Sequence, residues 1–375
     1  MKRRCVLLMG GMLLLPGVPC AAAQVTLYGY LDTGITYVSN QGGHSNTFMD
    51  TGNFVPNLVG FRGSEDLGAG TSAIFTLENQ FDLANGNTVP GARSLFSRQA
   101  WVGLSNNDWG RLTFGNQYDF MFDSLLFGGF HDANGGFDGA LPYGGFYNFR
   151  QGPFSALGIP NNPTGSADFD RVAGSARVPG SVKYQSANFA GLTFGALYGF
   201  GGVAGSLSAG NTVSLGANYS SGQFAAGAAY TDVRYPQMSN GQDGIRNFGA
   251  GMRYSFGPVM ASVLYTHTEN TQTQARIHVG QLGANWSLAP AWTLGGNVQY
   301  MKGNAILQSN NAVQLTSTLI YRFSKRTAVY AEGVYQRASG NGPATGAWIN
   351  GLFGPSAASS GRTQVLGRMG ITSAF

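Results

Sequence analysis

Apolar and polar residues alternate along most of the chain, as is typical of β-strands with one apolar face. The strand expected over residues 292–300 shows this most fully, because its apolar face begins at Trp292 and ends at Tyr300. Eight residue steps cover ~26 Å along a strand, or ~19 Å of height at a tilt of about 45°. The two rings are therefore expected at the two interfaces of a membrane. The core of a soluble β-sandwich would also give this pattern, but the alternation recurs in residues 25–32, 71–81, 192–200, 213–219 and 248–256.

Short and long connections between these segments alternate. The short ones are expected at residues 64–70, 105–108, 187–190, 220–222, 257–258, 289–291 and 324–326, and the long ones at 41–53, 82–96, 119–180, 201–211, 235–246, 266–275, 301–311 and 338–361. Outer-membrane barrels have short turns at one end and longer loops at the other. The pattern predicts an all-β fold, a 16-stranded antiparallel transmembrane β-barrel. An even strand number permits closure without an unpaired edge.

The connection at residues 119–180 is unusual in length and composition. It contains twelve Gly, five Pro and eleven aromatic residues, and its six Asp and three Arg give it a net charge of −3. A loop of this length within a compact domain is functional or is a sign of wrongly assigned strands. We interpret it as a constriction loop, the third long loop of the barrel, which folds inward and narrows the lumen.

The composition supports a membrane barrel. Charged residues make up 10% of the chain, against roughly 25% in soluble domains. No apolar run after residue 23 is long enough for a transmembrane helix. Few charges without such a run indicate that alternate residues meet two solvents, with lipid outside and water in the lumen.

The first 23 residues have the features of a cleaved signal peptide. Lys2-Arg3-Arg4 precedes an apolar run, and Ala21-Ala22-Ala23 fits the cleavage site. A lipoprotein signal at Cys20 is the alternative. Residues 24–375 are then expected to form one domain, free of cysteine because both cysteines lie in the removed segment. The remaining 19 basic and 17 acidic residues are nearly balanced, which disfavours a nucleic-acid partner.

Several charged residues lie on the strand face that is expected to point into the lumen, and they are candidates for the pore lining. The basic ones are Arg62, Arg111, Lys183, Arg253, Arg322 and Arg368, and the acidic ones are Glu78 and Glu332. Arg98 lies on the same expected strand face as apolar residues. Trp101 lies on the opposite face and is better suited to contact lipid, so we also predict that Arg98 points into the lumen. The loop contributes Asp119, Asp123, Asp132 and Asp138. The alternatives are that these groups are solvated wall charges that pair with one another, or that the loop acids tie the loop to the wall.

No catalytic set is apparent in the sequence. The four histidines, at positions 44, 131, 267 and 278, are far apart and lack the spacing of metal ligands. We therefore expect no enzyme activity, no cofactor and no metal site. An outer-membrane hydrolase assembled from distant strands, and calcium bound by the Asp-rich loops, remain as alternatives.

Several stretches resemble the trimeric outer-membrane porins of Gram-negative bacteria, in particular the general-diffusion type of beta-proteobacteria. They are residues 24–32 (QVTLYGYLD), 60–68 (GFRGSEDLG), 97–104 (SRQAWVGL), 181–191 (SVKYQSANFAG), 324–330 (SKRTAVY) and the terminal Phe375. The resemblance implies a sixteen-stranded homotrimer in outer-membrane lipid that passes small hydrophilic solutes and ions. It also implies that loop acids face wall bases across the constriction, and that Phe375 acts as an assembly signal.

The chain departs from these porins at three wall positions. Leu58, Asn116 and Thr372 stand where such porins commonly carry basic residues, whereas Arg98 and Lys183 keep the basic character. With a negatively charged loop, this predicts weak ion selectivity. A substrate-specific channel of the same fold, and a barrel adhesin or hydrolase, are the alternative functions.

Overall fold

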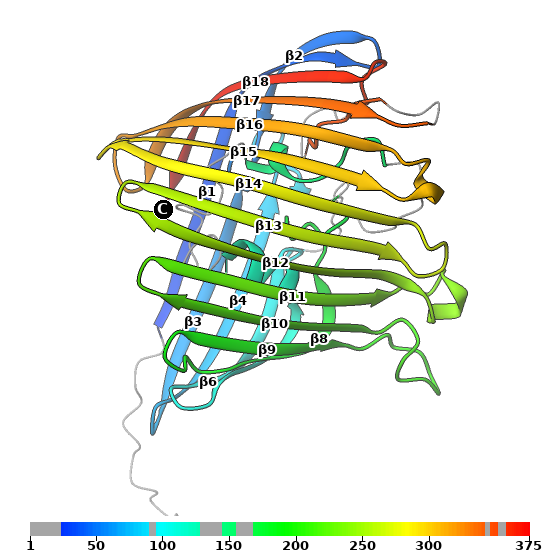
Figure 1. Cartoon of the computed structure of the whole chain (residues 1–375). Helices are drawn as coiled ribbons and strands as arrows, with labels where there is room; N and C mark the ends of the chain where they lie inside the picture. Colours follow the sequence, from blue (N-terminus) through cyan, green and yellow to red (C-terminus); the bar gives the residue numbers. More distant parts are fainter. Residues whose placement is uncertain (1–23, 90–94, 128–144, 155–167, 342–345, 352–357) are drawn as a thin grey trace, which may run out of the picture.

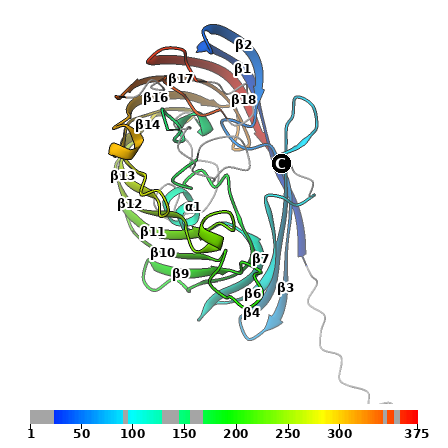
Figure 2. The same cartoon turned by 90° about the vertical axis from the view of Figure 1, so that its right-hand side faces the viewer.

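The computed structural model describes residues 24–89, 95–127, 145–154, 168–341, 346–351 and 358–375. The strands form one antiparallel sheet that closes on itself around a central space, because the first and last strands pair over residues 30–38 and 366–374 (Figures 1 and 2). The predicted signal peptide and the loop residues Asp132 and Asp138 lie outside the described residues.

Most of the described chain is strand. The strands are β1 (Gln24–Gln41), β2 (His44–Thr51), β3 (Leu58–Gly68), β4 (Thr71–Phe81), β5 (Thr88–Val89), β6 (Gln99–Asn106), β7 (Gly110–Gln117), β8 (Val178–Gln185), β9 (Leu192–Gly199), β10 (Thr212–Ser221), β11 (Phe224–Arg234), β12 (Gly244–Phe256), β13 (Val259–Asn270), β14 (Arg276–Ala289), β15 (Trp292–Gly303), β16 (Asn311–Arg322), β17 (Thr327–Ser339) and β18 (Thr363–Ala374). The helical turns are α1 (Phe120–Phe122), η1 (Asp123–Phe127), η2 (Gly145–Asn148), η3 (Ser239–Gly241) and η4 (Ala305–Leu307).

The 18 strand segments of the described chain make sixteen wall strands. β2 and β3 both pair with β1 and are two halves of one wall strand, interrupted at residues 52–57, while the two-residue β5 belongs to a connection. The predicted 16-stranded antiparallel barrel is thus confirmed. The long loop expected at residues 41–53 is wrong, because β2 occupies most of it after a tight turn at Gly42 and Gly43. The polar composition of residues 44–47 concealed that strand.

The barrel is apolar outside and polar inside, the reverse of a soluble domain. Leu282 and Leu315 are about half exposed on the outer face, at 60% and 49%, whereas the inward Gln281, Gln299 and Gln314 are almost fully buried. Exposed rings lie near both ends of the outer face: Tyr219, Tyr254, Trp286, Trp292 and Phe323 at one, and Tyr37, Phe248, Tyr265, Tyr300 and Tyr335 at the other. This distribution matches an apolar band flanked by two aromatic girdles. No helix in the described part of the chain is long and apolar enough to span a membrane.

Connections differ in length at the two ends of the barrel. We call the end with turns such as residues 257–258 and 290–291 the short-turn end, and the end with residues 118–177 and 340–362 the long-loop end. In outer-membrane barrels the short turns face the periplasm and the long loops face the outside of the cell.

The described parts of the connection after β7 lie against the inner wall (Figure 2). Phe120 packs against Gly195 and Gly216, where an added Cβ would lie 2.3 and 2.4 Å from the ring. Met121 and Leu125 are fully buried in the same apolar cluster. Because glycine has no side chain, these wall positions leave the space into which the loop packs.

Candidate functional site

The candidate site is the contact between the loop and the inner wall. Asp119 opens α1, and its carboxylate accepts a hydrogen bond from the amide of Met121, as an N-cap residue does. The same carboxylate pairs with Arg171 from the returning part of the loop at 2.6 Å and accepts a hydrogen bond from Thr231 on β11. One acid thus joins the two ends of the loop and the wall.

A second ion pair fixes the beginning of the loop. Lys183 on β8 pairs with Asp123 and donates to the carbonyl oxygen of Tyr118 at 2.9 Å. The lysine side chain is 5% exposed and the Asp123 side chain 20% exposed. The lysine charge therefore lies beneath the loop.

The later parts of the loop are held by a third ion pair. Arg150 pairs with Asp170 at 3.1 Å, and neither side chain is more than 2% exposed. Arg150 also donates to Gln281 on β14, and Asp170 accepts a hydrogen bond from Thr266 on β13 at 2.7 Å. A buried charge-assisted network of this kind gives the docked loop a defined geometry.

Asp168 is buried in the same part of the loop. It accepts hydrogen bonds from the amides of Ala173 and Ser175 and from the Ser175 hydroxyl. Burial, and secondly the negative charge of Asp170, raise the pKa of Asp168 to about 6. The two acids therefore repel each other at neutral pH within a loop that is otherwise held by attraction.

The wall around Glu78 carries another paired group. Arg98 lies 3.4 Å from Glu78 and donates to Gln80, and its carbonyl oxygen accepts a hydrogen bond from Arg177 of the loop. Arg98 is 3% exposed and Glu78 7%. Both are inside the barrel, but in contact with each other.

The reasoning that placed Arg98 inside by means of Trp101 was wrong. Trp101 pairs with Thr76, which in turn pairs with the inward Arg62, and residues directly opposite each other on paired strands point to the same face of the sheet. Trp101 therefore faces inward, where it donates a hydrogen bond to Gln99. Val102, at 58% exposure, faces out. Arg98 precedes the first residue of β6 and escapes the alternation of that strand.

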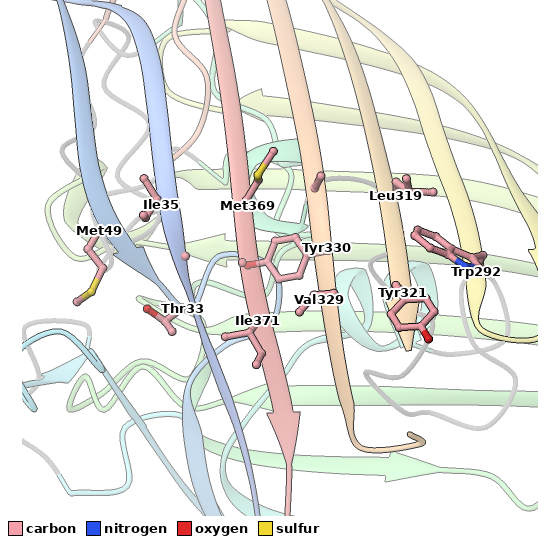
Figure 3. A pocket seen from close by; sticks show the side chains of 13 residues that line it. Thr33, Ile35, Met49, Trp292, Leu319, Tyr321, Val329, Tyr330, Met369 and Ile371 are labelled. Atoms are coloured by element: carbon pink, nitrogen blue, oxygen red, sulfur yellow. The ribbon is translucent and has the colours of Figure 1, made fainter. Parts of the chain in front are cut away.

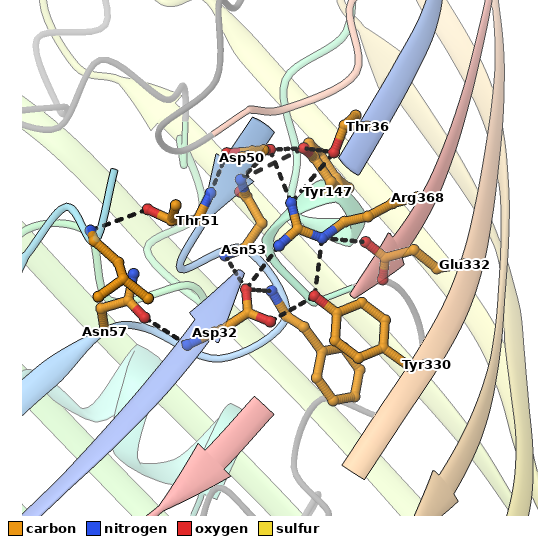
Figure 4. A network of polar contacts seen from close by, with 12 residues as sticks. Asp32, Thr36, Asp50, Thr51, Asn53, Asn57, Tyr147, Tyr330, Glu332 and Arg368 are labelled. Carbon is orange, nitrogen blue, oxygen red and sulfur yellow. Dashed lines mark hydrogen bonds and ion pairs between the residues drawn. The ribbon is translucent and has the colours of Figure 1, made fainter. Parts of the chain in front are cut away.

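A buried charge network of four residues lies at the seam between the first and last strands. Arg368 on β18 lies 3.0 Å from Asp32, 3.3 Å from Asp50 and 3.9 Å from Glu332, and all four side chains are fully buried (Figure 4). The loop reaches this network because Tyr147 donates to Asp50. The network joins β1, β2, β17, β18 and the loop around one guanidinium group.

The predicted lining residues fall into distinct groups. Arg98, Lys183, Arg368, Glu78, Asp119 and Glu332 are buried in ion pairs, and Asp123 is partly exposed in one. Arg62 and Arg111 are exposed, and Arg253 and Arg322 are half-buried. Asp132 and Asp138 lie outside the described residues. Phe375 lies against Gly29 and exchanges two backbone hydrogen bonds with it.

The less buried arginines lie toward the short-turn end. Arg62 stacks over the ring of Tyr28 at 5.3 Å, and Arg111 donates from Nε to Gln185. Arg322 donates to the hydroxyl of Thr293 at 3.0 Å. Arg62 and Arg111 form no ion pair with any described carboxylate. The ion pairs at the loop and the positive charges of Arg62 and Arg111 below it are therefore separated along the pore.

The sequence did not single out the residues that anchor the loop. Arg150, Arg171, Asp168 and Asp170 were visible only as contributions to loop charge, and Tyr147 only as one of many aromatics. They lie in a stretch without regular alternation of apolar and polar residues, so no partner could be inferred from their positions. Among the described residues, no group of three His, Asp or Glu side chains is arranged to hold a metal.

Comparisons with known proteins agree with this architecture. A family model described as Gram-negative porin matches residues 12–341. An outer membrane porin protein of Bordetella pertussis is 30% identical over 74% of this chain, and the match spans 62% of that relative. Outer membrane porin protein 32 of Delftia acidovorans is 26% identical, over 96% of each chain. The solved structure of an anion-selective porin from Comamonas acidovorans superposes with a TM-score of 0.73 at 22% identity, covering 94% of this chain and 100% of that one.

Proposed function

The chain belongs to the Gram-negative porin family, and we propose that its barrel passes small hydrophilic solutes and ions by passive diffusion with a preference for anions. It is a channel of the outer membrane rather than an enzyme. The distribution of charge along the inner wall carries the proposed preference.

The loop contributes less negative charge to the lumen than its composition suggests. Asp119, Asp123 and Asp170 are each paired with a base, and only Asp123 of the three is appreciably exposed. The charges of these three acids are therefore balanced by their partners, and Asp168 is buried among hydrogen-bond donors. The pairing weakens one of the two reasons for expecting weak selectivity, the negative charge of the loop, and leaves the other, the absence of basic residues at Leu58, Asn116 and Thr372.

Positive charge dominates the described wall below the loop. The guanidinium groups of Arg62 and Arg111 are exposed there, and Arg253 and Arg322 are half-buried. Rings of one charge sign set ion preference in water-filled pores. The solved porin of Comamonas acidovorans is itself described as anion-selective, which is consistent with this proposal.

Reversal potentials in a potassium chloride gradient test the preference. We expect chloride to be favoured over potassium, and the double substitution Arg62→Gln with Arg111→Gln to lower the permeability ratio toward one. Arg337→Gln removes the same charge from an exposed position on the outer face and should leave the ratio unchanged. A cation preference in the parent protein would refute the proposal, and an absence of stepwise conductance would refute the channel itself.

We also propose that the barrel assembles as a homotrimer through the outer face of its seam. An apolar groove of about 650 Å³ crosses β1, β2 and β15–β18 there (Figure 3). Small side chains such as Thr33 and Ala331 form its floor, and Met49, Met369 and Trp292 rise around it. Met369 is 74% exposed in the single chain. A second barrel would cover these protruding side chains more completely than mobile acyl chains do.

Native electrophoresis and light scattering in detergent test this assembly. Ala331→Trp fills the groove and should convert trimers to monomers. Leu282→Trp adds the same ring to another exposed outward position and should leave the trimer intact. A parent protein that is monomeric at all detergent concentrations would contradict the trimer.

A further inference from the structure

Two histidines meet on the outer face of the barrel, near its long-loop end. His267 on β13 and His278 on β14 are eleven positions apart in the sequence but lie directly opposite each other in the antiparallel register. Residues opposite each other on paired strands point to the same face of the sheet. That face is the outer one, because His278 is exposed and Tyr265, two residues before His267, is 40% exposed. His267 itself is covered by the rings of His278 and Phe248.

The distance between the two imidazole rings fits a shared metal ion. The Nδ1 atoms of His267 and His278 are 3.3 Å apart, and the ring planes are inclined by 53°. Zinc binds imidazole nitrogen at ~2.0–2.1 Å with tetrahedral geometry, so two nitrogens on one zinc ion are separated by about 3.3–3.4 Å. The two nitrogens therefore already have the separation of ligands to one ion, and the backbone of β13 and β14 need not move.

The other nitrogen of each ring can carry the proton that a metal ligand must give up at Nδ1. A histidine binds metal as the neutral imidazole, with its proton on the second nitrogen. The Nε2 atoms of His267 and His278 form no hydrogen bond with any residue that the structure describes, so both rings can take this form. The hydroxyl of Tyr265 lies 2.7 Å from Nδ1 of His278 and adds a third polar group beside the two nitrogens.

The charged groups around the two histidines do not attract a cation. Glu269 and Arg276 lie opposite each other one step further along the same face and form an ion pair at 2.8 Å. Arg246 pairs with Asp232 at 3.6 Å and lies 3.9 Å from Glu269. Lys302 on β15 is next to the second histidine in the register and pairs with no described carboxylate. The surroundings thus carry a formal charge of +1, and a cation is held there only by bonds to imidazole nitrogen.

We propose that His267 and His278 form a two-histidine site for a divalent transition metal, zinc or copper, at the outer surface of the barrel. Imidazole suits these two metals, whereas magnesium and calcium require oxygen ligands. Neither histidine lines the groove proposed as the trimer contact, and neither points into the lumen, so the site is independent of the pore. A bound ion stabilises the folded barrel, because its two ligands meet only when β13 and β14 are paired.

Calorimetric titration of zinc chloride into the purified full barrel, in detergent and without a histidine tag, tests the site. We expect the parent protein to bind one zinc ion per chain, and His267→Ala and His278→Ala each to weaken this binding about tenfold or more. His44→Ala removes a histidine from β2, away from the pair, and should leave the zinc affinity unchanged. Lys302→Gln removes the neighbouring positive charge and should strengthen binding. Magnesium chloride should show no binding that depends on either histidine.

Copper identifies the ligands directly. With one equivalent of Cu²⁺, electron paramagnetic resonance should show coupling to two imidazole nitrogens in the parent protein and to one in His278→Ala. Zinc should raise the unfolding temperature of the parent and leave that of His278→Ala unchanged; the removed side chain is exposed, so this variant keeps its packing. Equal zinc affinity in the parent and both histidine variants would overturn the site, as would an equal loss in His44→Ala. Conductance enters none of these measurements, so such a failure leaves the channel function intact.

Discussion

Lys183 and Asp123 form the ion pair that joins the inner wall of β8 to the first turn of the loop. The lysine ammonium also donates to the carbonyl of Tyr118, 2.9 Å away. A wall base and a loop acid that the sequence placed on opposite sides of the lumen are thus in direct contact. Their charges anchor the loop and do not face each other across the lumen.

Removal of this lysine should loosen the loop. Lys183→Met leaves Asp123 without its partner, and breaking a buried pair costs about 3–5 kcal/mol, which the partial exposure of Asp123 reduces to roughly 1–3 kcal/mol. We expect larger fluctuations of the open-channel current and frequent partial closures in bilayer recordings. The exchanged pair Lys183→Asp with Asp123→Lys should restore a quieter current. Equal noise in the single variant and the parent would contradict an anchoring role.

The seam network predicts two opposite effects on stability. Arg368→Gln leaves Asp32, Asp50 and Glu332 buried together without a cation, so we expect a loss of about 3–5 kcal/mol or failure to fold. Glu332→Gln should instead raise the temperature at which the barrel unfolds in detergent. Glu332 is the most distant of the three acids from Arg368, and neither of its oxygens accepts a hydrogen bond from the described residues.

Electrophoretic mobility after heating measures both effects, because folded barrels migrate differently from unfolded chains. Glu78→Gln changes an acid that is hydrogen-bonded to Tyr28 and Gln99 and should lower the unfolding temperature. If Glu332→Gln destabilised the barrel as strongly as Glu78→Gln, the excess of acid over base at the seam would not be a source of strain.

The sequence was sufficient for the barrel and insufficient for the site, and the reason is physical. Because one face of each strand contacts lipid, every second residue is apolar, as Leu282 is. This alternation alone identifies the strands and the positions that point inward. It says nothing about what covers an inward side chain. Arg368 and Asp32 are 336 positions apart and meet only because the sheet closes. The break at residues 52–57 likewise depends on loop contacts, since the carbonyl of Asn53 accepts a hydrogen bond from Phe146.

The buried pair of acids in the loop predicts a pH dependence. The pKa of Asp168 is about 6 in the folded protein, above the ordinary value of 3.8, so the docked loop binds a proton more tightly than the free loop does. Docking is therefore strongest in acid and weakens as pH rises from about 4 to about 6, by on the order of 1–3 kcal/mol. We expect quieter currents at pH 5 than at pH 7.5.

Asp168→Asn should flatten this pH dependence and keep the current quiet at both values. The asparagine oxygen can still accept the hydrogen bond from the amide of Ala173, and the asparagine nitrogen, in the place of the second carboxylate oxygen, can donate to the Ser175 hydroxyl. Asp243→Asn is the matched control in an outer loop, where hydrogen bonds from Ser239 and Thr271 hold the pKa of the carboxyl below its usual value. Asp243 stays ionised across this pH range, and its loss should leave the pH response of the current unchanged.

Glycines of the inner wall leave the space in which the loop packs, so filling that space should change the pore. At Gly216 an added Cβ would lie 2.4 Å from a Phe120 ring atom and 2.5 Å from the Ser124 hydroxyl, so Gly216→Ala must displace these two side chains of the loop. Overpacking of a close contact costs about 1–3 kcal/mol. We expect a changed single-channel conductance and a less stable open current. Gly280→Ala adds the same methyl group on the outer face of β14, where no atom lies within 4 Å, and should leave both unchanged. Identical conductance in Gly216→Ala and Gly280→Ala would show that the contact of Phe120 with the wall does not set the width of the pore.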